Sequence, residues 1–184
     1  MFVRGDIRLA LEPTQLEALV SEVVETYEAA FEKAGVTLAC NVSRTTASSP
    51  CISCDRQRIW RAIQNLINNA KDAMTAGGSI TLRVTSVDGM AVIQVADTGN
   101  GIPEPIQTRL FEPFVSYGKK HGTGLGLAIV KNIVDAHGGT ISFETSIGFG
   151  TIFTIKLPSS PPVGRNNQLT AEKREREVQE LTNV

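Results

Sequence analysis

The sequence predicts an α+β sandwich, in which a single sheet carries all of its helices on one face. Three observations predict this fold. Apolar residues recur at helical spacing in two segments, two strand-like segments flank the turn signal Asp88-Gly89, and two more follow a third helix that ends at a pair of glycines. The resulting order of helix, strand, helix, hairpin, helix and hairpin favours one sheet covered by helices.

The first helix is predicted from Glu12 to about Ala34, with a capping box formed by Thr14 and Glu17 and a stop at Gly35. A strand at Val36–Val42, a polar loop and a short extended piece around Ile52 are expected to follow it. The second helix is predicted to begin at the N-cap residue Asp55 and to end at about Thr75, before two glycines.

The second half of the chain is predicted to begin with a hairpin. Its strands are Ile80–Val87 and Ala91–Ala96, because Asp-Gly between alternating apolar segments is a strong signal for a two-residue turn. The third helix is expected at Gly124–Ala136, ended by a pair of glycines. Two strands, Thr140–Thr145 and Thr151–Leu157, complete the sheet.

Composition excludes several classes of protein. The chain has 184 residues, 41% of them hydrophobic and 20% charged, which is too apolar for a disordered chain. A formal net charge of -1 argues against a basic surface for nucleic acid. Since no apolar run approaches the about 20 residues of a membrane span and no signal-peptide pattern is present, we expect a soluble, cytoplasmic domain without membrane contact.

The spacing of the cysteines in Cys51-x-x-Cys54 is typical of zinc-binding or redox-active pairs. A structural zinc takes four ligands, and only Cys40, His121 and His137 remain to complete such a set. Both histidines lie far along the chain in glycine-rich surroundings. We therefore expect small residues that fill a strand and a loop, and the sequence leaves any redox or metal role open.

A polar stripe lies beside the apolar face of the second helix. Asn65, Asn69 and Asp72 follow one another at i, i+4 and i+7, although exposed helix positions usually carry lysine, glutamate, glutamine or arginine. Short amide and carboxylate oxygens suit a hard cation such as Mg²⁺ that shares its shell with phosphate. The stripe therefore predicts a site that needs fixed oxygens close to the helix.

Two glycine-rich loops add to this site. The segment 97–103 follows a strand directly, and its Asp97 carboxylate is able to accept a hydrogen bond from an exocyclic amine. The segment 122–127 opens the third helix, where exposed N–H groups and the helix dipole favour phosphate. It is not a Walker A loop, because it lacks the Gly-Lys-Ser/Thr ending.

A dinucleotide-binding Rossmann unit is the alternative for the second loop. Glu144 lies 22 residues after Gly122, near the place of a ribose-binding acid. However, the glycine spacing differs from G-x-G-x-x-G and residues 115–121 are polar rather than a buried strand. That interpretation also leaves the asparagine stripe unexplained.

Four motifs in order identify a resemblance. Residues 65–73 (NLINNAKDA), 97–102 (DTGNGI), 111–114 (FEPF) and 122–127 (GTGLGL) resemble the N box, first glycine box, F box and second glycine box of sensor histidine kinases. The chain from about Leu16 to Pro158 is similar to their catalytic ATP-binding domain, within the GHKL ATPase superfamily. The resemblance implies the Bergerat fold, with about three helices on one face of a mixed, mostly antiparallel sheet.

The resemblance also implies roles for single residues, with ATP and Mg²⁺ as ligands. Asn69 would hold Mg²⁺ at the ATP phosphates, Asp97 would accept from the adenine amine, and Gly99 and Gly101 would let the base lie close. The segment between Phe114 and Gly122 would be the ATP lid, anchored to the core by the rings of Phe111 and Phe114. The full nucleotide-contacting set would be Asn69, Asp72, Ala73, Asp97, Gly99, Gly101, Ile102, Phe114, Tyr117, Gly122, Thr123, Gly124, Leu125, Gly126, Leu127 and Thr151.

The resemblance favours a kinase over a hydrolase. Hydrolases of the superfamily place a glutamate base where this chain has Asn65, and a neutral amide takes no proton from water. The implied catalytic residues are Asn65, Asn69, Lys119 and Lys120. Position 72 is Asp where many sensor kinases have a cation, so the resemblance leaves its role open.

We expect three parts in the chain: a connector at 1–12, the ATP-binding domain at 13–158, and a linker with a charged tail at 159–184. The implied activity is transfer of the γ-phosphoryl group to a histidine of a dimerisation domain that would precede residue 1. A response regulator would be an indirect partner, and the isolated domain is expected to be monomeric. A serine kinase of the anti-sigma type and a non-catalytic ATP-sensing module are the alternatives.

Overall fold

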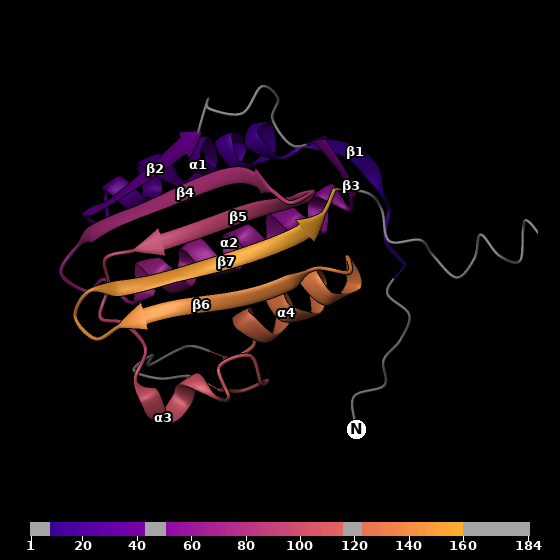
Figure 1. Ribbon diagram of the computed structural model, residues 1–184. Helices are drawn as coiled ribbons and strands as arrows, with labels where there is room; N and C mark the ends of the chain where they lie inside the picture. Colours follow the sequence, from indigo (N-terminus) through magenta and orange to yellow (C-terminus); the bar gives the residue numbers. More distant parts are fainter. Residues whose placement is uncertain (1–7, 43–50, 116–122, 160–184) are drawn as a thin grey trace, which may run out of the picture.

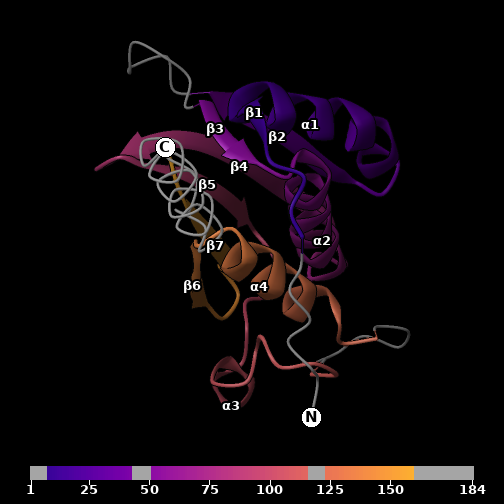
Figure 2. The same ribbon diagram turned by 90° about the vertical axis from the view of Figure 1, so that its right-hand side faces the viewer.

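The computed structural model describes residues 8–42, 51–115 and 123–159, and these residues form two layers. A five-stranded sheet makes one layer, and three long helices pack on one of its faces (Figures 1 and 2). The helices are α1 (Leu16–Glu32), α2 (Arg56–Asp72) and α4 (Gly126–Ala136). The predicted α+β sandwich is confirmed.

The sheet is mixed and mostly antiparallel. Its strand order is β2-β4-β5-β7-β6, in which β2 and β4 are parallel and every other neighbouring pair is antiparallel. Because parallel neighbours need a crossover, α2 serves as the helix that joins them across the sheet. The strands are β2 (Val36–Val42), β4 (Gly78–Val87), β5 (Met90–Asp97), β6 (Thr140–Ser146) and β7 (Gly150–Pro158).

Local signals place these elements as the sequence predicts. Asp55 caps α2, since its carboxylate accepts from the Arg58 N–H at 3.1 Å. Asp88 and Gly89 have φ of 51° and 72°, the left-handed pair that closes a two-residue hairpin. Along β4, Ile80, Leu82 and Val84 are buried at every second position, and this period of two turns them towards the helices.

The start of the first helix was predicted wrongly. Residues Glu12–Gln15 form the strand β1, which pairs antiparallel with β3 (Cys51–Cys54), and α1 begins only at Leu16. The capping box is absent: the Thr14 hydroxyl donates to the carbonyl of Glu12, and no side chain of the described residues caps α1. Pairing with a strand about 40 residues away overrides a local capping pattern.

Smaller differences concern the other helix ends. The helix α2 ends at Asp72 rather than at about Thr75, and α4 begins at Gly126 rather than at Gly124, whose φ of 67° is not helical. A short helix, α3 (Glu104–Gln107), lies in the segment that was predicted as a loop. Among the described residues, no helix is both long and apolar enough to cross a bilayer.

Candidate functional site

A cavity of about 570 Å³ opens between α2, the start of α4 and the loop that follows β5. Its size lies within the ordinary range for small-molecule sites, roughly 300–1,000 Å³. Asn69, Asp97 and Gly124 all line it, so the prediction that the asparagine stripe and the two glycine-rich loops meet at one cavity is confirmed. Further predicted residues on its wall are Asn65, Asp72, Ala73, Gly101, Ile102, Thr123, Leu125, Gly126, Leu127 and Thr151.

Asp97 lies at the carboxyl end of β5 and is 8% exposed. Its Oδ1 accepts two backbone hydrogen bonds, from Gly99 at 2.8 Å and from Thr151 at 3.2 Å. Burial raises the pKa of Asp97, and the two N–H donors offset part of that rise. Within the described part of the chain both bonds go to Oδ1, so Oδ2 is the oxygen that a ligand amine would meet.

The loop after β5 is held in place by hydroxyl and backbone contacts. The Ile102 N–H donates to Thr145 Oγ1 at 2.9 Å, and that oxygen lies 3.0 Å from Thr151 Oγ1. The Asn100 N–H donates to the carbonyl of Ala73 at 3.1 Å. These contacts hold the loop against β6, β7 and the end of α2, so its conformation is fixed before any ligand binds.

The two asparagines face the start of α4. Asn65 donates through Nδ2 to the carbonyl of Arg61 at 2.8 Å, which leaves its Oδ1 on the other side. A Cβ placed on Gly126 would lie 3.3 Å from that Oδ1 and 3.5 Å from Nδ2 of Asn69. Glycine at 126 thus brings the helix N-terminus close to the asparagine stripe.

The N-terminus of α4 has no side-chain cap among the described residues, and Leu125 occupies the N-cap position. The first N–H groups of a helix have no partner within it, so they are donors for an anion in the cavity. Across the segment 116–122, the Phe114 N–H donates to the carbonyl of Gly124 at 2.9 Å. The ends of the predicted ATP lid are therefore joined.

The glycines of the first loop meet a packing requirement. A Cβ on Gly99 would meet Ala73 and Asp97 at 2.9 Å, and a Cβ on Gly101 would lie 2.4 Å from the carbonyl of Ser146. At both positions the protein's own atoms fill the space that a side chain would need. The glycines therefore allow the loop to pack against the end of α2 and the β6–β7 hairpin. The approach of a base to Gly99 and Gly101 stays a prediction.

One predicted lid anchor is wrong. The Phe114 ring is 68% exposed and does not line the cavity, whereas Phe111 packs edge-on against Phe143 with ring centres 6.0 Å apart. Phe114 also has φ of 67°, a backbone conformation that is uncommon for a residue other than glycine. Gly99 also does not line the cavity. The predicted residues Tyr117, Lys119, Lys120 and Gly122 lie outside the described residues.

Several cavity residues were missed. Most are apolar and come from α3, the segments beside it and α4, and their sequence context resembles any core or loop. They are Ala70, Thr75, Asn100, Pro103, Ile106, Leu110, Val115, Ile129 and Phe153. Residues such as Ile106 and Leu110 follow a glycine-proline loop closely, which is the only local signal that they border a site.

The family model of histidine kinase-, DNA gyrase B- and HSP90-like ATPases matches residues 54–161. The chain belongs to this ATPase family. Its curated relatives include the sensor protein DivL of Caulobacter vibrioides, 32% identical over 160 residues, and the alginate biosynthesis sensor protein KinB of Pseudomonas aeruginosa, 43% identical over 110 residues. The matches cover 87% and 59% of this chain but only 20% and 18% of those proteins.

Solved structures of this ATPase family agree with the fold. The catalytic domain of histidine kinase ThkA, 28% identical, superposes with a TM-score of 0.74 over 83% of this chain and 98% of that domain. Full-length ShkA in complex with AMPPNP, 31% identical, gives a TM-score of 0.75 over 87% of this chain and 33% of ShkA. The chain thus corresponds to the ATP-binding catalytic domain of two-component histidine kinases.

Proposed function

We propose that this domain binds ATP with Mg²⁺ and transfers the γ-phosphoryl group to a histidine on a separate dimerisation domain of the same protein. The observation that carries the proposal is the single cavity that gathers a buried carboxylate, an asparagine stripe and an uncapped helix N-terminus. Two relatives add support: ShkA was crystallised with AMPPNP, and ThkA was crystallised with the response regulator TrrA. A response regulator is accordingly the indirect partner, and the cytoplasm is the compartment we propose.

The nucleotide would lie with its base at Asp97 and its phosphates at α4. Oδ2 of Asp97 accepts from the adenine amine, and Ile102 and Leu110 supply apolar wall around the base. The N–H groups at the start of α4 then meet phosphate oxygens, where the helix dipole favours negative charge. Binding at both ends orients the γ-phosphoryl group for an incoming nucleophile.

The residues present fit a magnesium ion. Amide oxygens are hard donors of the kind that Mg²⁺ takes together with water and phosphate, and the asparagine stripe lies beside the start of α4 with only glycine between them. We propose that Asn69 holds the ion and that Asn65, one helical turn earlier, assists it. When bound, the ion neutralises phosphate charge.

Transfer fits the chemistry of the site better than hydrolysis does. Asn65 is neutral, so it takes no proton from water, and an acceptor histidine brings its own nucleophilic nitrogen. The nitrogen forms a bond to the γ-phosphorus while the bond to the β–γ bridging oxygen breaks, and ADP leaves with that electron pair. The domain contributes positioning and charge stabilisation.

Transfer of label tests this proposal. The chain is incubated with ATP carrying a radioactive γ-phosphate and with a helical-hairpin acceptor domain that contains a histidine. We expect acid-labile label on the acceptor, and none when that histidine is replaced by alanine. Nucleotide binding without transfer would instead favour an ATP-sensing module, and acid-stable label would favour a serine kinase.

Asn69→Ala tests the metal assignment. We expect it to weaken ATP binding by about ten- to 150-fold in Mg²⁺ and far less in EDTA, since a hydrogen bond or ligand to a charged group contributes about 1.5–3 kcal/mol. Asn68→Ala is the matched control, because Asn68 lies on the same helix but not on the cavity wall. Calorimetry that finds equal losses with and without Mg²⁺ would contradict a metal role.

A further inference from the structure

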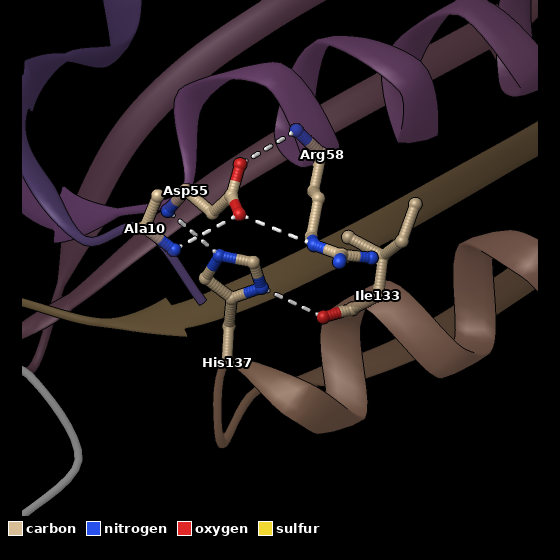
Figure 3. A network of polar contacts seen from close by, with 5 residues as sticks. All are labelled: Ala10, Asp55, Arg58, Ile133 and His137. Atoms are coloured by element: carbon tan, nitrogen blue, oxygen red, sulfur yellow. Dashed lines mark hydrogen bonds and ion pairs between the residues drawn. The ribbon is translucent and has the colours of Figure 1, made fainter. Parts of the chain in front are cut away.

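A second polar cluster lies at the opposite ends of the two helices that carry the site (Figure 3). His137 follows the last residue of α4 and is 3% exposed, and Asp55 caps the start of α2 and is 7% exposed. Nε2 of His137 lies 3.0 Å from the backbone nitrogen of Asp55, and Nδ1 lies 2.7 Å from the carbonyl oxygen of Ile133. One imidazole ring therefore joins α4 to the first residue before α2.

The two backbone partners determine the state of the ring. A carbonyl oxygen only accepts, so Nδ1 carries the proton, and a backbone N–H only donates, so Nε2 is the acceptor. His137 must therefore be neutral and must hold a single tautomer for both bonds to form. The bond to Asp55 is the one that crosses between helices, and the bond to Ile133 stays within α4.

Asp55 connects a third segment to the same point. Its Oδ2 accepts from the Ala10 N–H at 3.2 Å and from Nε of Arg58 at 3.1 Å (Figure 3). Burial by itself would raise the pKa of Asp55, but the N–H donors of Arg58 and Ala10 and the Arg58 charge together lower it. The carboxylate therefore stays ionised and binds the segment that enters the domain at residues 8–11.

The other end of α4 lies at the cavity. Its N-terminus has no side-chain cap among the described residues and faces the cavity, and Ile129, one turn inside the helix, lines the cavity wall. With 11 residues, α4 is about 16 Å long and behaves as a short rigid rod. A shift at His137 would therefore be carried to the N–H groups at the start of α4 and would change their position relative to Asn65.

We propose that the Asp55–His137 junction is a joint through which the entering segment at Ala10 sets the position of α4 and thereby the affinity of the cavity for ATP. The inference rests on the nucleotide-binding part of the proposed function and not on the identity of the phosphoacceptor. His137 is a positioning residue in this scheme, since it does not line the cavity.

Two variants of His137 distinguish an effect on the position of α4 from a general loss of stability of the domain. Glutamine places its amide oxygen near the position of Nε2 and keeps an acceptor for the Asp55 N–H, whereas asparagine reaches only the position of Nδ1 and keeps the donor to Ile133. Each variant loses one of the two hydrogen bonds, so both should melt at similarly lowered temperatures. ATP affinity is measured by calorimetry on the whole chain, well below both melting temperatures.

We expect His137→Asn to bind Mg²⁺–ATP at least about fivefold more weakly than wild type, a typical size for coupling between sites, and His137→Gln to bind it nearly as well as wild type. Equal affinity in the asparagine variant and wild type, or equal losses in both variants, would overturn the inference alone. A wild-type chain that binds no ATP would overturn the proposed function together with it.

Hydrogen exchange tests the contribution of the entering segment. Coupling between sites is reciprocal, so ATP must in turn strengthen the bonds at the joint. We expect ATP to slow exchange of the Ala10 and Asp55 amides in wild type and in His137→Gln, but not in His137→Asn. Exchange at Ala10 that ATP leaves unchanged in wild type would overturn the role of the entering segment.

Discussion

Asp97→Asn is expected to weaken ATP binding by about ten- to 150-fold, which corresponds to the 1.5–3 kcal/mol of a hydrogen bond to a charged group. The amide oxygen still accepts from the N–H groups of Gly99 and Thr151, so the loop keeps its shape. The amide nitrogen then occupies the place of Oδ2. A donor there faces the adenine amine, which is itself a donor, and the attraction is lost.

A comparison of ATP with GTP makes this result specific. Guanine carries a carbonyl oxygen at the position of the adenine amine, so wild type should strongly prefer ATP, and Asp97→Asn should lose or reverse that preference. Titration calorimetry of both nucleotides with both proteins measures the four affinities. If the substitution lowered the affinities for ATP and GTP equally, Asp97 would not be the group that recognises the adenine amine.

The same substitution should make the free domain more stable at neutral pH. Because the folded-state pKa of Asp97 is raised, the folded protein binds this proton more tightly than the unfolded chain does. The resulting stabilisation is complete below the unfolded pKa and is lost as the pH rises through the folded pKa. The ionised carboxylate therefore costs the free domain stability near pH 7, and asparagine removes that cost.

Local chemistry explains which parts of the structure were predictable. The cap at Asp55, the turn at Asp88-Gly89 and the stripe of Asn65 and Asn69 each depend on residues within one or two turns of the chain. Such features are set by backbone preferences and by helical period, both of which the sequence displays directly. The cavity could be predicted because the asparagine stripe and the glycine-rich loops that line it are short motifs, each contained in a few consecutive turns or residues.

Features that depend on distant segments could not be read in the same way. The strand β1 exists because β3 pairs with it, and Thr145 matters because its hydroxyl reaches Ile102, 43 residues away. Likewise, nothing in the sequence context of His137 points to Asp55, 82 residues earlier. Only the packed structure brings these residues together.

Gly150→Ala is expected to destabilise the domain by about 3–5 kcal/mol, through backbone strain and overpacking together. Gly150 is buried with φ of 109°, and a Cβ there would lie 1.9 Å from the carbonyl oxygen of Asp97 and 3.0 Å from the Cα of Thr98. All of these contacts are with backbone, so no side chain is able to move aside. The substitution must push β7 away from the end of β5, where Asp97 stands.

Gly148→Ala is the matched control in the same hairpin. Gly148 has φ of 78°, but no atom lies within 4 Å of a Cβ placed there, so only the left-handed backbone is strained, at about 1–2 kcal/mol. Urea denaturation measures both losses. ATP affinity should fall only in folded Gly150→Ala, because that variant displaces the Thr151 N–H from Asp97. If the two variants lost equal stability and bound ATP alike, then close contact between β5 and β7 would not be what holds the Asp97 carboxylate in position.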